Sequence, residues 1–313
     1  MELRQLRYFV AIADSGSFTK AAERVFVAQS ALSHQLAQLE GELGAVLFNR
    51  SRRGAELTEA GQRFFPHAVS ILRQAEEARA SARQADEEPS GKVVFGIPHS
   101  VSQALALPLL REVRQRFPQV ELELTEELTG NLIRQLRTGQ IQLAVLFDDG
   151  NLAGLAVTRV LSEQLCLIEP AAEAGPGSRR SVSLKQALAQ PLILPASPHG
   201  VRPIIESAAA AAGLPPPRVF ADISSISILR TTLLAGLGRT LLPVMPLLPE
   251  IEAGLLRATP VSSPRLDRVL AICASAHMPR SHACQAVSGL VVALMQRLCA
   301  KGQWQGSKAV ENG

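Results

Sequence analysis

The chain has 313 residues, 47% of them hydrophobic and 19% charged, and a formal net charge of +4 at pH 7; this length allows two or three domains with a substantial core. Its four cysteines are scattered, without a Cys-x-x-Cys motif or a histidine in ligand spacing, which argues against a disulfide framework and against a zinc site. The sequence lacks both an apolar N-terminal signal and a run of about 18 uncharged apolar residues, so we expect a cytoplasmic protein that does not enter a membrane.

Two short amphipathic helices, joined by a tight polar turn, are predicted within the first sixty residues. The first covers residues 17–26, and the second covers residues 29–43, where leucines at 32, 36, 39 and 43 form one apolar face. The opposite face of the second helix carries small or polar residues, namely Ser30, Ser33, His34, Ala37 and Gln38. A helix that is buried on one side and lined with short polar groups on the other suits the major groove of DNA.

A basic loop follows the second helix. Residues 49–54 contain three arginines, which on a wing would reach phosphates or the minor groove. The segment is therefore typical of a winged helix-turn-helix, and periodicity alone leaves open that the polar face is only solvated. The candidate DNA-binding residues are Gln29, Ser30, Ser33, His34, Gln38, Arg50, Arg52 and Arg53.

A long run of positions forms one specific pattern over this segment: Leu3, Leu6, Phe9, Gly16, Ser17, Phe18, Ala21, Ala22, Val27, Gln29, Ala31, Leu32, Ser33, Gln35, Leu39, Glu40, Leu43, Gly44, Leu47, Phe48, Arg50, Leu57, Thr58, Ala60 and Gly61. Residue by residue, this pattern resembles the N-terminal domain of the LysR-type transcriptional regulators. The resemblance implies a regulator that binds double-stranded promoter DNA. Two positions depart from the family pattern: Ala28 replaces the usual Ser or Thr cap, at a cost of about 1 kcal/mol, and His34 replaces a common Arg.

A single long helix is predicted next, over residues 58–88, and Pro89 ends it. A heptad seam runs along it through Phe64, Ala68, Ile71, Ala75, Ala78, Ala82 and Ala85. About 30 residues would make a rod of roughly 45 Å. We expect it to pair with a second copy, and the resemblance implies that it joins two DNA-binding heads into a homodimer, with a homotetramer formed through the effector lobes.

The remainder of the chain alternates between strands and helices. Strands are expected at 92–97, 120–125 and 141–147, with helices at 101–117 and 128–139, as in a parallel sheet covered on both faces. The predicted fold class is therefore α/β: a winged helix-turn-helix (1–60), a linker helix and hinge (61–90), and a two-lobe effector domain (91–300) resembling periplasmic solute-binding proteins. Lobe I would span about 91–162 and 266–300, lobe II about 163–265, and 301–313 would be a polar, frayed tail.

A small molecule would bind in the crevice between the lobes, at the carboxyl ends of the strands. The candidate effector-binding residues are Ser100, Val101, Ser102, Thr129, Phe147, Ser197, His199, Gly200, Arg202, Ser224 and Ser225. The segment His199 to Arg202 resembles the His-Gly-Leu-Arg of the nitrogen-assimilation subgroup, and Arg202 is suited to a carboxylate. Two alternatives stay open: the serines are simple helix caps, and Arg202 forms an inter-lobe salt bridge.

Enzyme signatures are missing from the sequence. It has no Gly-x-Ser-x-Gly elbow, no His-Glu-x-x-His and no P-loop, and the glycines at 236 and 238 precede a strand rather than a helix. We therefore expect a DNA-binding regulator with no catalytic residues, metal ligands or cofactors, controlled by a small anionic effector. The alternative is a cytosolic small-molecule-binding protein or an enzyme of the solute-binding fold, which would leave the first 88 residues unexplained.

Overall fold

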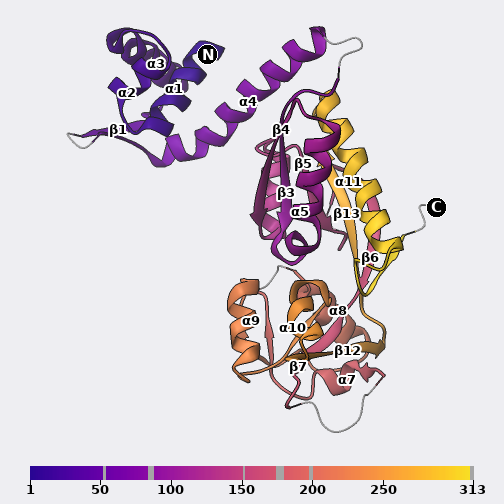
Figure 1. The fold of residues 1–313 in the computed structure, drawn as a ribbon. Helices are drawn as coiled ribbons and strands as arrows, with labels where there is room; N and C mark the ends of the chain where they lie inside the picture. Colours follow the sequence, from indigo (N-terminus) through magenta and orange to yellow (C-terminus); the bar gives the residue numbers. More distant parts are fainter. Residues whose placement is uncertain (52–53, 84–87, 151, 174–179, 197–199, 311–313) are drawn as a thin grey trace. The chain divides into compact units, whose positions relative to one another are not determined.

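The computed structural model describes residues 1–51, 54–83, 88–150, 152–173, 180–196 and 200–310. They form two compact units (Figure 1). The first comprises residues Met1–Glu87 with the short segment Thr138–Gln140, and the second holds the remainder.

The first unit is a three-helix head with a hairpin and a long helix. Its elements are α1 (Leu3–Ser15), α2 (Phe18–Arg24), α3 (Gln29–Leu43), β1 (Phe48–Ser51), β2 (Gly54–Leu57) and α4 (Glu59–Arg83). The Ser17 hydroxyl caps α2 by accepting the Lys20 N–H, and Gly16 ends α1 in the left-handed region at φ 60°. The ring of Phe9 packs 5.3 Å from Phe48 and 5.2 Å from Phe64, which joins α1, the hairpin and α4. The winged helix-turn-helix is confirmed.

The first part of the predicted heptad seam packs within the head. Ala68 is fully buried in the head core, and Phe64 and Ile71 pack against the same cluster. This corrects the expectation that the whole seam faces a second chain, because α1 covers these positions. Of the later positions, Ala75 is half-buried and Ala78 exposed. Ala85 lies outside the described residues.

Lobe I is built on a six-stranded sheet in the order β14-β6-β13-β5-β3-β4. Its strands are β3 (Gly91–Pro98), β4 (Val120–Glu127), β5 (Leu143–Phe147), β6 (Leu155–Gln164), β13 (Asp267–Ser275) and β14 (Ser307–Ala309). The first three run parallel, as predicted, but β13 is antiparallel to both β5 and β6. The sheet is therefore mixed, because β6 leaves for lobe II and β13 returns from it.

Helices cover both faces of this sheet. The core that β3 and β5 share with α5 (His99–Arg116) and α11 (His282–Ala300) lies on one face, and α6 (Thr129–Arg137) packs against the other. By length and composition α11 would be able to cross a membrane, yet one such helix is weak evidence. Its Val287, Val291 and Met295 are buried in the lobe I core, so we assign it to that core.

Lobe II holds a four-stranded sheet, β11-β7-β12-β8, and a separate parallel pair, β9 and β10. The strands are β7 (Cys166–Pro170), β8 (Val182–Ser183), β9 (Leu192–Leu194), β10 (Val219–Asp222), β11 (Thr240–Leu242) and β12 (Leu256–Ser263). The helices are α7 (Leu184–Ala187), α8 (Arg202–Ala211), α9 (Ile226–Leu234), the 3-10 helix η1 (Met245–Leu247) and α10 (Leu248–Glu252). The chain enters this lobe after β6 and leaves it after β12, near the lobe boundaries expected at about 162–163 and 265–266.

The C-terminal segment is not the frayed tail that its polar composition suggested. Trp304 is 1% exposed, and its indole N–H donates to Glu163 Oε1 at 2.7 Å. Residues 307–309 form β14, which pairs with β6 along the edge of the lobe I sheet. One buried aromatic ring therefore fixes a segment whose other residues are mostly polar. Residues 311–313 lie outside the described part.

Candidate functional site

The second helix of the helix-turn-helix, α3, separates a buried face from a polar one. Leu32, Leu36 and Leu39 are completely buried in the head. Gln29, Ser30, His34 and Gln38 are exposed, whereas Ser33 is half-buried and accepts a hydrogen bond from Gln29 Nε2 at 3.4 Å. The N-cap Ala28 provides no side-chain cap, as its identity predicts. The exposed face thus presents amide, hydroxyl and imidazole groups with few bonds to the protein itself.

The β1–β2 hairpin is held against the turn between α1 and α2. The Ala55 N–H donates to the Gly16 carbonyl at 2.8 Å, and a Cβ at Gly54 would clash with that oxygen. Arg50, on β1, is exposed, and its guanidinium carbon lies 4.4 Å from the centre of the Phe18 ring. Arg50 therefore has an anchoring contact with Phe18 while its charge is exposed to solvent. Arg52 and Arg53 lie outside the described residues.

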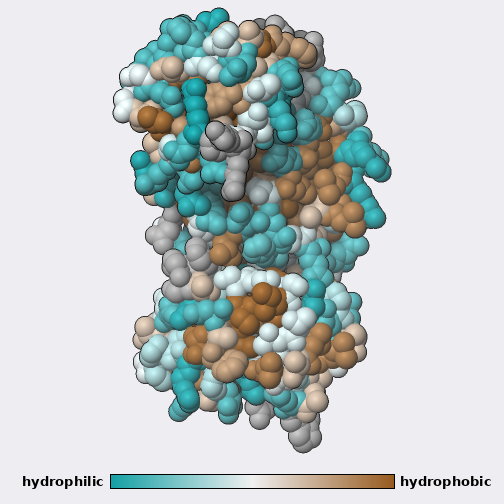
Figure 2. Space-filling model, turned by 90° about the vertical axis from the view of Figure 1, so that its left-hand side faces the viewer, coloured by the Kyte–Doolittle hydropathy of each residue, from teal (hydrophilic) through white to brown (hydrophobic). Residues whose placement is uncertain are grey.

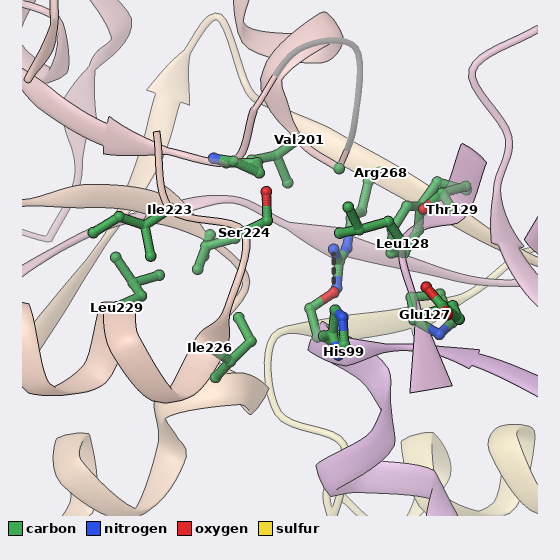
Figure 3. Close-up of a pocket in the computed structure, with 16 residues that line it drawn as sticks. His99, Glu127, Leu128, Thr129, Val201, Ile223, Ser224, Ile226, Leu229 and Arg268 are labelled. Carbon is green, nitrogen blue, oxygen red and sulfur yellow. Dashed lines mark hydrogen bonds between the residues drawn. The ribbon is translucent and has the colours of Figure 1, made fainter. Parts of the chain in front are cut away.

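A cleft between the two lobes forms the second candidate site (Figure 3). Its empty volume is about 470 Å³, including the part open to solvent. Lobe I contributes Pro98, His99, Ser100, Glu127, Leu128, Thr129, Phe147 and Arg268, and lobe II contributes Pro195, Gly200, Val201, Ile223, Ser224, Ile226, Leu229 and Leu242. Most of these side chains are apolar, with polar groups at a few points, as in small-molecule sites generally.

Four helices begin at the wall of this cleft. The lining includes the first residues of α5 and α6 from lobe I, and residues at the start of α8 and α9 from lobe II. The N-cap of α5 is Pro98, which provides no side-chain acceptor. The first turns of these helices and the positive ends of their dipoles therefore lie at the wall of the cleft, where they favour negative charge.

Five of the predicted effector-binding residues line the cleft: Ser100, Thr129, Phe147, Gly200 and Ser224. Four others do not. Val101 is buried in the lobe I core, Ser102 bonds to the His99 carbonyl and to Glu126, and Ser225 caps α9 by accepting the Ile228 N–H. For Ser102 and Ser225 the local bonding of a helix start accounts for the hydroxyl. Ser197 and His199 lie outside the described residues.

Arg202, the fourth, is engaged by lobe II itself. Its Nε lies 2.8 Å from Glu206, its Nη1 pairs with Asp222, and the side chain is 17% exposed. The hydrogen bond to Glu206 raises the pKa of the guanidinium, and Asp222 adds to this effect. Two carboxylates therefore occupy the groups that we expected to hold an effector. The salt bridge is within one lobe, so it also differs from the inter-lobe alternative.

The arginine that does line the cleft is Arg268, which the sequence analysis did not single out. It stands on β13 directly opposite Glu163 on β6, and the side chains are 1% and 0% exposed. Its Nε donates to Glu163 at 2.7 Å, its Nη1 donates to Ser100 Oγ at 2.9 Å, and its Cζ lies 4.2 Å from the Phe147 ring centre. The sequence offered one indication of this site, a charged residue within the otherwise apolar strand 267–275. It was missed because β6, the strand that carries its partner Glu163, was not predicted.

Comparison with known proteins identifies the class. Residues 3–62 match the family described as bacterial regulatory helix-turn-helix protein, lysR family, and residues 86–296 match the LysR substrate binding domain. The chain therefore belongs to the LysR family of DNA-binding transcriptional regulators, with a DNA-binding head and an effector-binding domain.

Among its relatives are two nitrogen assimilation regulatory proteins named nac. The protein from Klebsiella aerogenes is 34% identical over 298 residues, which cover 95% of this chain and 96% of the relative. The protein from Escherichia coli K12 is 32% identical and covers 97% and 99%. A full-length OxyR variant from Pseudomonas aeruginosa has the same fold, with a TM-score of 0.72 at 23% identity over 100% of this chain and 99% of that one. Full-length CbnR, solved in complex with its target DNA, gives a TM-score of 0.66 at 23% identity over 94% and 100%.

Proposed function

We propose that α3 and the β1–β2 hairpin contact promoter DNA, and that a small molecule bound in the interlobe cleft controls this regulator. The observation that carries the DNA assignment is the polar face of α3, which is exposed directly opposite three fully buried leucines. A helix of this kind is fixed to its domain by one side and free to enter the major groove with the other.

The two parts of the head have different roles in this proposal. Gln29, Ser33 and His34 stand at the start of α3, where recognition helices reach base edges, so they would select the sequence. Arg50, with Arg52 and Arg53, would bind phosphates and fix the position of the head without reading bases. The polar groups Ser30 and Gln38 flank this face.

We further propose that the chain acts as a homodimer or homotetramer. Ala75 and Ala78 on α4 remain uncovered by the head core and continue the predicted seam. In lobe I, Leu107 and Leu110 on α5 are 55% and 44% exposed and line a groove of mixed polarity together with Arg111 and Arg114. Lobe II carries a second hydrophobic surface on and just after α9, where Ile228, Leu234 and Leu237 are exposed, and Figure 2 shows brown patches over this lobe. Exposed apolar surfaces of this kind are suited to contacts between copies.

The relatives support the same role. Because the nac proteins are named as regulators and not as enzymes, we place this chain with nitrogen-assimilation regulators, acting in the cytoplasm without catalytic activity. The cleft, rather than a catalytic centre, would then be the place where a metabolite is sensed. A ligand changes the state of the protein only through its different affinities for the open and closed lobes.

The test is an electrophoretic mobility shift with DNA from upstream of the chain's own gene. We expect the triple variant Gln29→Ala, Ser33→Ala, His34→Ala to lose specific binding by at least about ten-fold, since each good base contact contributes roughly 1–3 kcal/mol. The matched control is Gln62→Ala, an exposed glutamine on α4, which should bind as the unmodified protein does. Equal binding by the triple variant would exclude α3 as the recognition element.

A further inference from the structure

We propose that Arg268 is the anion-binding group of the interlobe cleft, that Glu163 and Trp304 position it, and that its ligand is a small monocarboxylate with an apolar body. This inference rests on the proposed function of the cleft and deepens it. It also moves the proposed carboxylate site away from Arg202, because the Arg202 guanidinium is already paired with Glu206 and Asp222 of its own lobe.

The first argument is the hydrogen-bond inventory of the guanidinium. Nε and Nη1 of Arg268 have partners, Glu163 and Ser100, but Nη2 is buried and has no hydrogen-bond partner among the residues that the structure describes. A buried donor without an acceptor is unfavourable, so a ligand that places an acceptor at this point would be stabilised. Figure 3 shows Arg268 on the lobe I side of the cleft, with Ser224 and Ile226 on the other side.

The second argument is the electrostatics of the wall. The α5 helix has 18 residues, and Ser100 in its first turn already accepts from Arg268, so the Ser100 hydroxyl hydrogen is free to point elsewhere. The start of α6 at Thr129 adds another set of N–H groups. Glu163 balances the charge of Arg268, so the attraction comes from fixed, desolvated donors rather than from net charge.

The acidic and titratable groups nearby are already engaged. Glu127, the one carboxylate in the described lining, accepts a hydrogen bond from Asn131 Nδ2 at 2.9 Å. His99 Nδ1 lies 3.2 Å from Glu126, which also bonds to Ser102. Each of these carboxylates has a partner within lobe I other than Arg268 and Ser100, whose donors remain for the ligand.

The third argument concerns the rest of the ligand. Opposite Arg268, lobe II presents Val201, Ile223, Ile226, Leu229 and Leu242, and Phe147 stacks on the guanidinium from lobe I. A ligand that fills this space has one polar end and an apolar remainder. An inorganic anion would satisfy the donors but leave the apolar wall uncovered.

The geometry also explains what holds Arg268 in place. Glu163 uses both carboxylate oxygens, one for Arg268 Nε and the other for the Trp304 indole at 2.7 Å. The two strands that carry Glu163 and Arg268 are the ones that continue into the crossovers between lobes. Trp304 is therefore a positioning residue: its N–H fixes the carboxylate that orients the guanidinium.

The experiment uses the full-length protein and its single tryptophan, Trp304, as a fluorescent reporter. The probes are 3-methylbutanoate and benzoate, each compared with its neutral amide. We expect saturable fluorescence changes with at least one carboxylate and binding of its amide at least about ten-fold weaker, because a charge-assisted hydrogen bond is lost. Isothermal titration calorimetry gives the affinities independently.

Variants then assign the group. Arg268→Lys keeps a cation beside Glu163 but lacks the planar, multiple N–H donors of a guanidinium. It should therefore weaken carboxylate binding about ten- to a hundred-fold. Arg202→Lys is the matched control and should bind normally. Ser100→Ala tests the site without touching the buried ion pair and should also weaken the carboxylate. For Trp304→Phe, followed by calorimetry, we expect a smaller preference of carboxylate over amide, which a purely structural role would leave unchanged.

Three outcomes would overturn the proposal: no carboxylate in the panel binds, acid and amide bind alike, or Arg268→Lys binds as the unmodified protein does. DNA binding without ligand separates this failure from that of the proposed function. If the mobility shift persists while the carboxylates fail, only the anion assignment falls. If the shift also fails, the regulatory assignment of the head falls with it.

Discussion

The recognition helix α3 and the interlobe cleft are both built from polar side chains on an apolar scaffold, but they hold those side chains differently. On α3 the polar groups face solvent, and the one bond recorded among Gln29, Ser33 and His34 is the long contact of 3.4 Å between the first two. In the cleft, Arg268 is buried and fixed from three directions by Glu163, Ser100 and Phe147. DNA supplies its own ordered acceptors, so the helix side chains can remain adaptable. A small ligand supplies few contacts, so the protein fixes its donors in advance.

The largest expected effect is on stability, and it tests the buried ion pair of Arg268 and Glu163 at the cleft. Glu163→Ala leaves Arg268 buried without a counter-charge, and we expect it to destabilise lobe I by about 3–5 kcal/mol. Urea unfolding followed by Trp304 fluorescence measures this directly. The matched change on α3 is Gln38→Ala, an exposed site, which should stay within about 0.5 kcal/mol. A loss below about 1 kcal/mol for Glu163→Ala would mean that the pair is not fixed as described.

The next prediction concerns base reading by the exposed face of α3. His34→Arg introduces a bidentate donor at an exposed position and should shift the preferred half-site toward guanine, by roughly 1–3 kcal/mol. Selection of operators from a randomised DNA library by both proteins provides the measurement. Identical selected sequences would show that residue 34 does not meet base edges.

A third prediction uses the buried thiols. Burial raises the pKa of Cys166 to about 11, and burial together with Asp148 raises the pKa of Cys273 to about 12. Below about pH 8 both thiols are protonated in the folded and in the unfolded chain, so they have no pH effect there. Above pH 9 the unfolded thiols ionise first, and stability should fall with a slope of up to about 1.4 kcal/mol per pH unit for each thiol.

Urea unfolding at pH 8, 9 and 10 measures this slope. Cys273→Ala should lower the starting stability because of its lost volume, yet reduce the loss between pH 9 and 10. The same pH slope in the variant and in the unmodified chain would contradict the buried-thiol account. The exposed face of α3 carries no comparable group, so changes there should leave the slope unaltered.

The smallest expected effect lies in the wing. Arg50→Ala removes the contact with Phe18 and should cost about 0.5–1 kcal/mol of head stability. If Arg50 also binds a phosphate, the salt dependence of DNA affinity should flatten by about 0.9 in logarithmic slope. Arg52→Ala with Arg53→Ala should flatten the slope further and weaken specific and non-specific binding alike. An unchanged slope would remove the wing from the interface.

The sequence predicted the head more completely than the cleft, and the reason is physical. Both faces of α3 belong to one continuous stretch of sequence. Leu32 and Leu36 and the polar positions between them can therefore be predicted from the helical periodicity alone. The same is true of β3, α5 and β5, whose predicted spans fall close to the observed ones.

The cleft depends instead on residues that meet only through the topology. Ser100, Glu163, Arg268 and Trp304 stand on four different segments, and no local pattern connects them. Arg202 attracted attention because it follows a glycine at a helix start, yet Asp222, which is near only in the fold, takes its charge. Ser225 was also wrongly expected in the cleft, but for a local reason: its hydroxyl caps α9, which the sequence analysis had left open as an alternative.

The interrupted course of lobe I has a consequence for how the protein is made on the ribosome. Lobe II is one continuous stretch between β6 and β13, so all of its strands have been synthesised while lobe I still lacks β13, α11 and β14. Domains tend to fold as they are completed during synthesis. The head and lobe II can therefore fold first. Meanwhile β3, β4 and β5 have an unpaired edge at β5, because its partner β13 is synthesised more than a hundred residues later. Nascent chains stalled before residue 267 would expose that edge, and a chaperone that shields unpaired strands would act at this stage of synthesis.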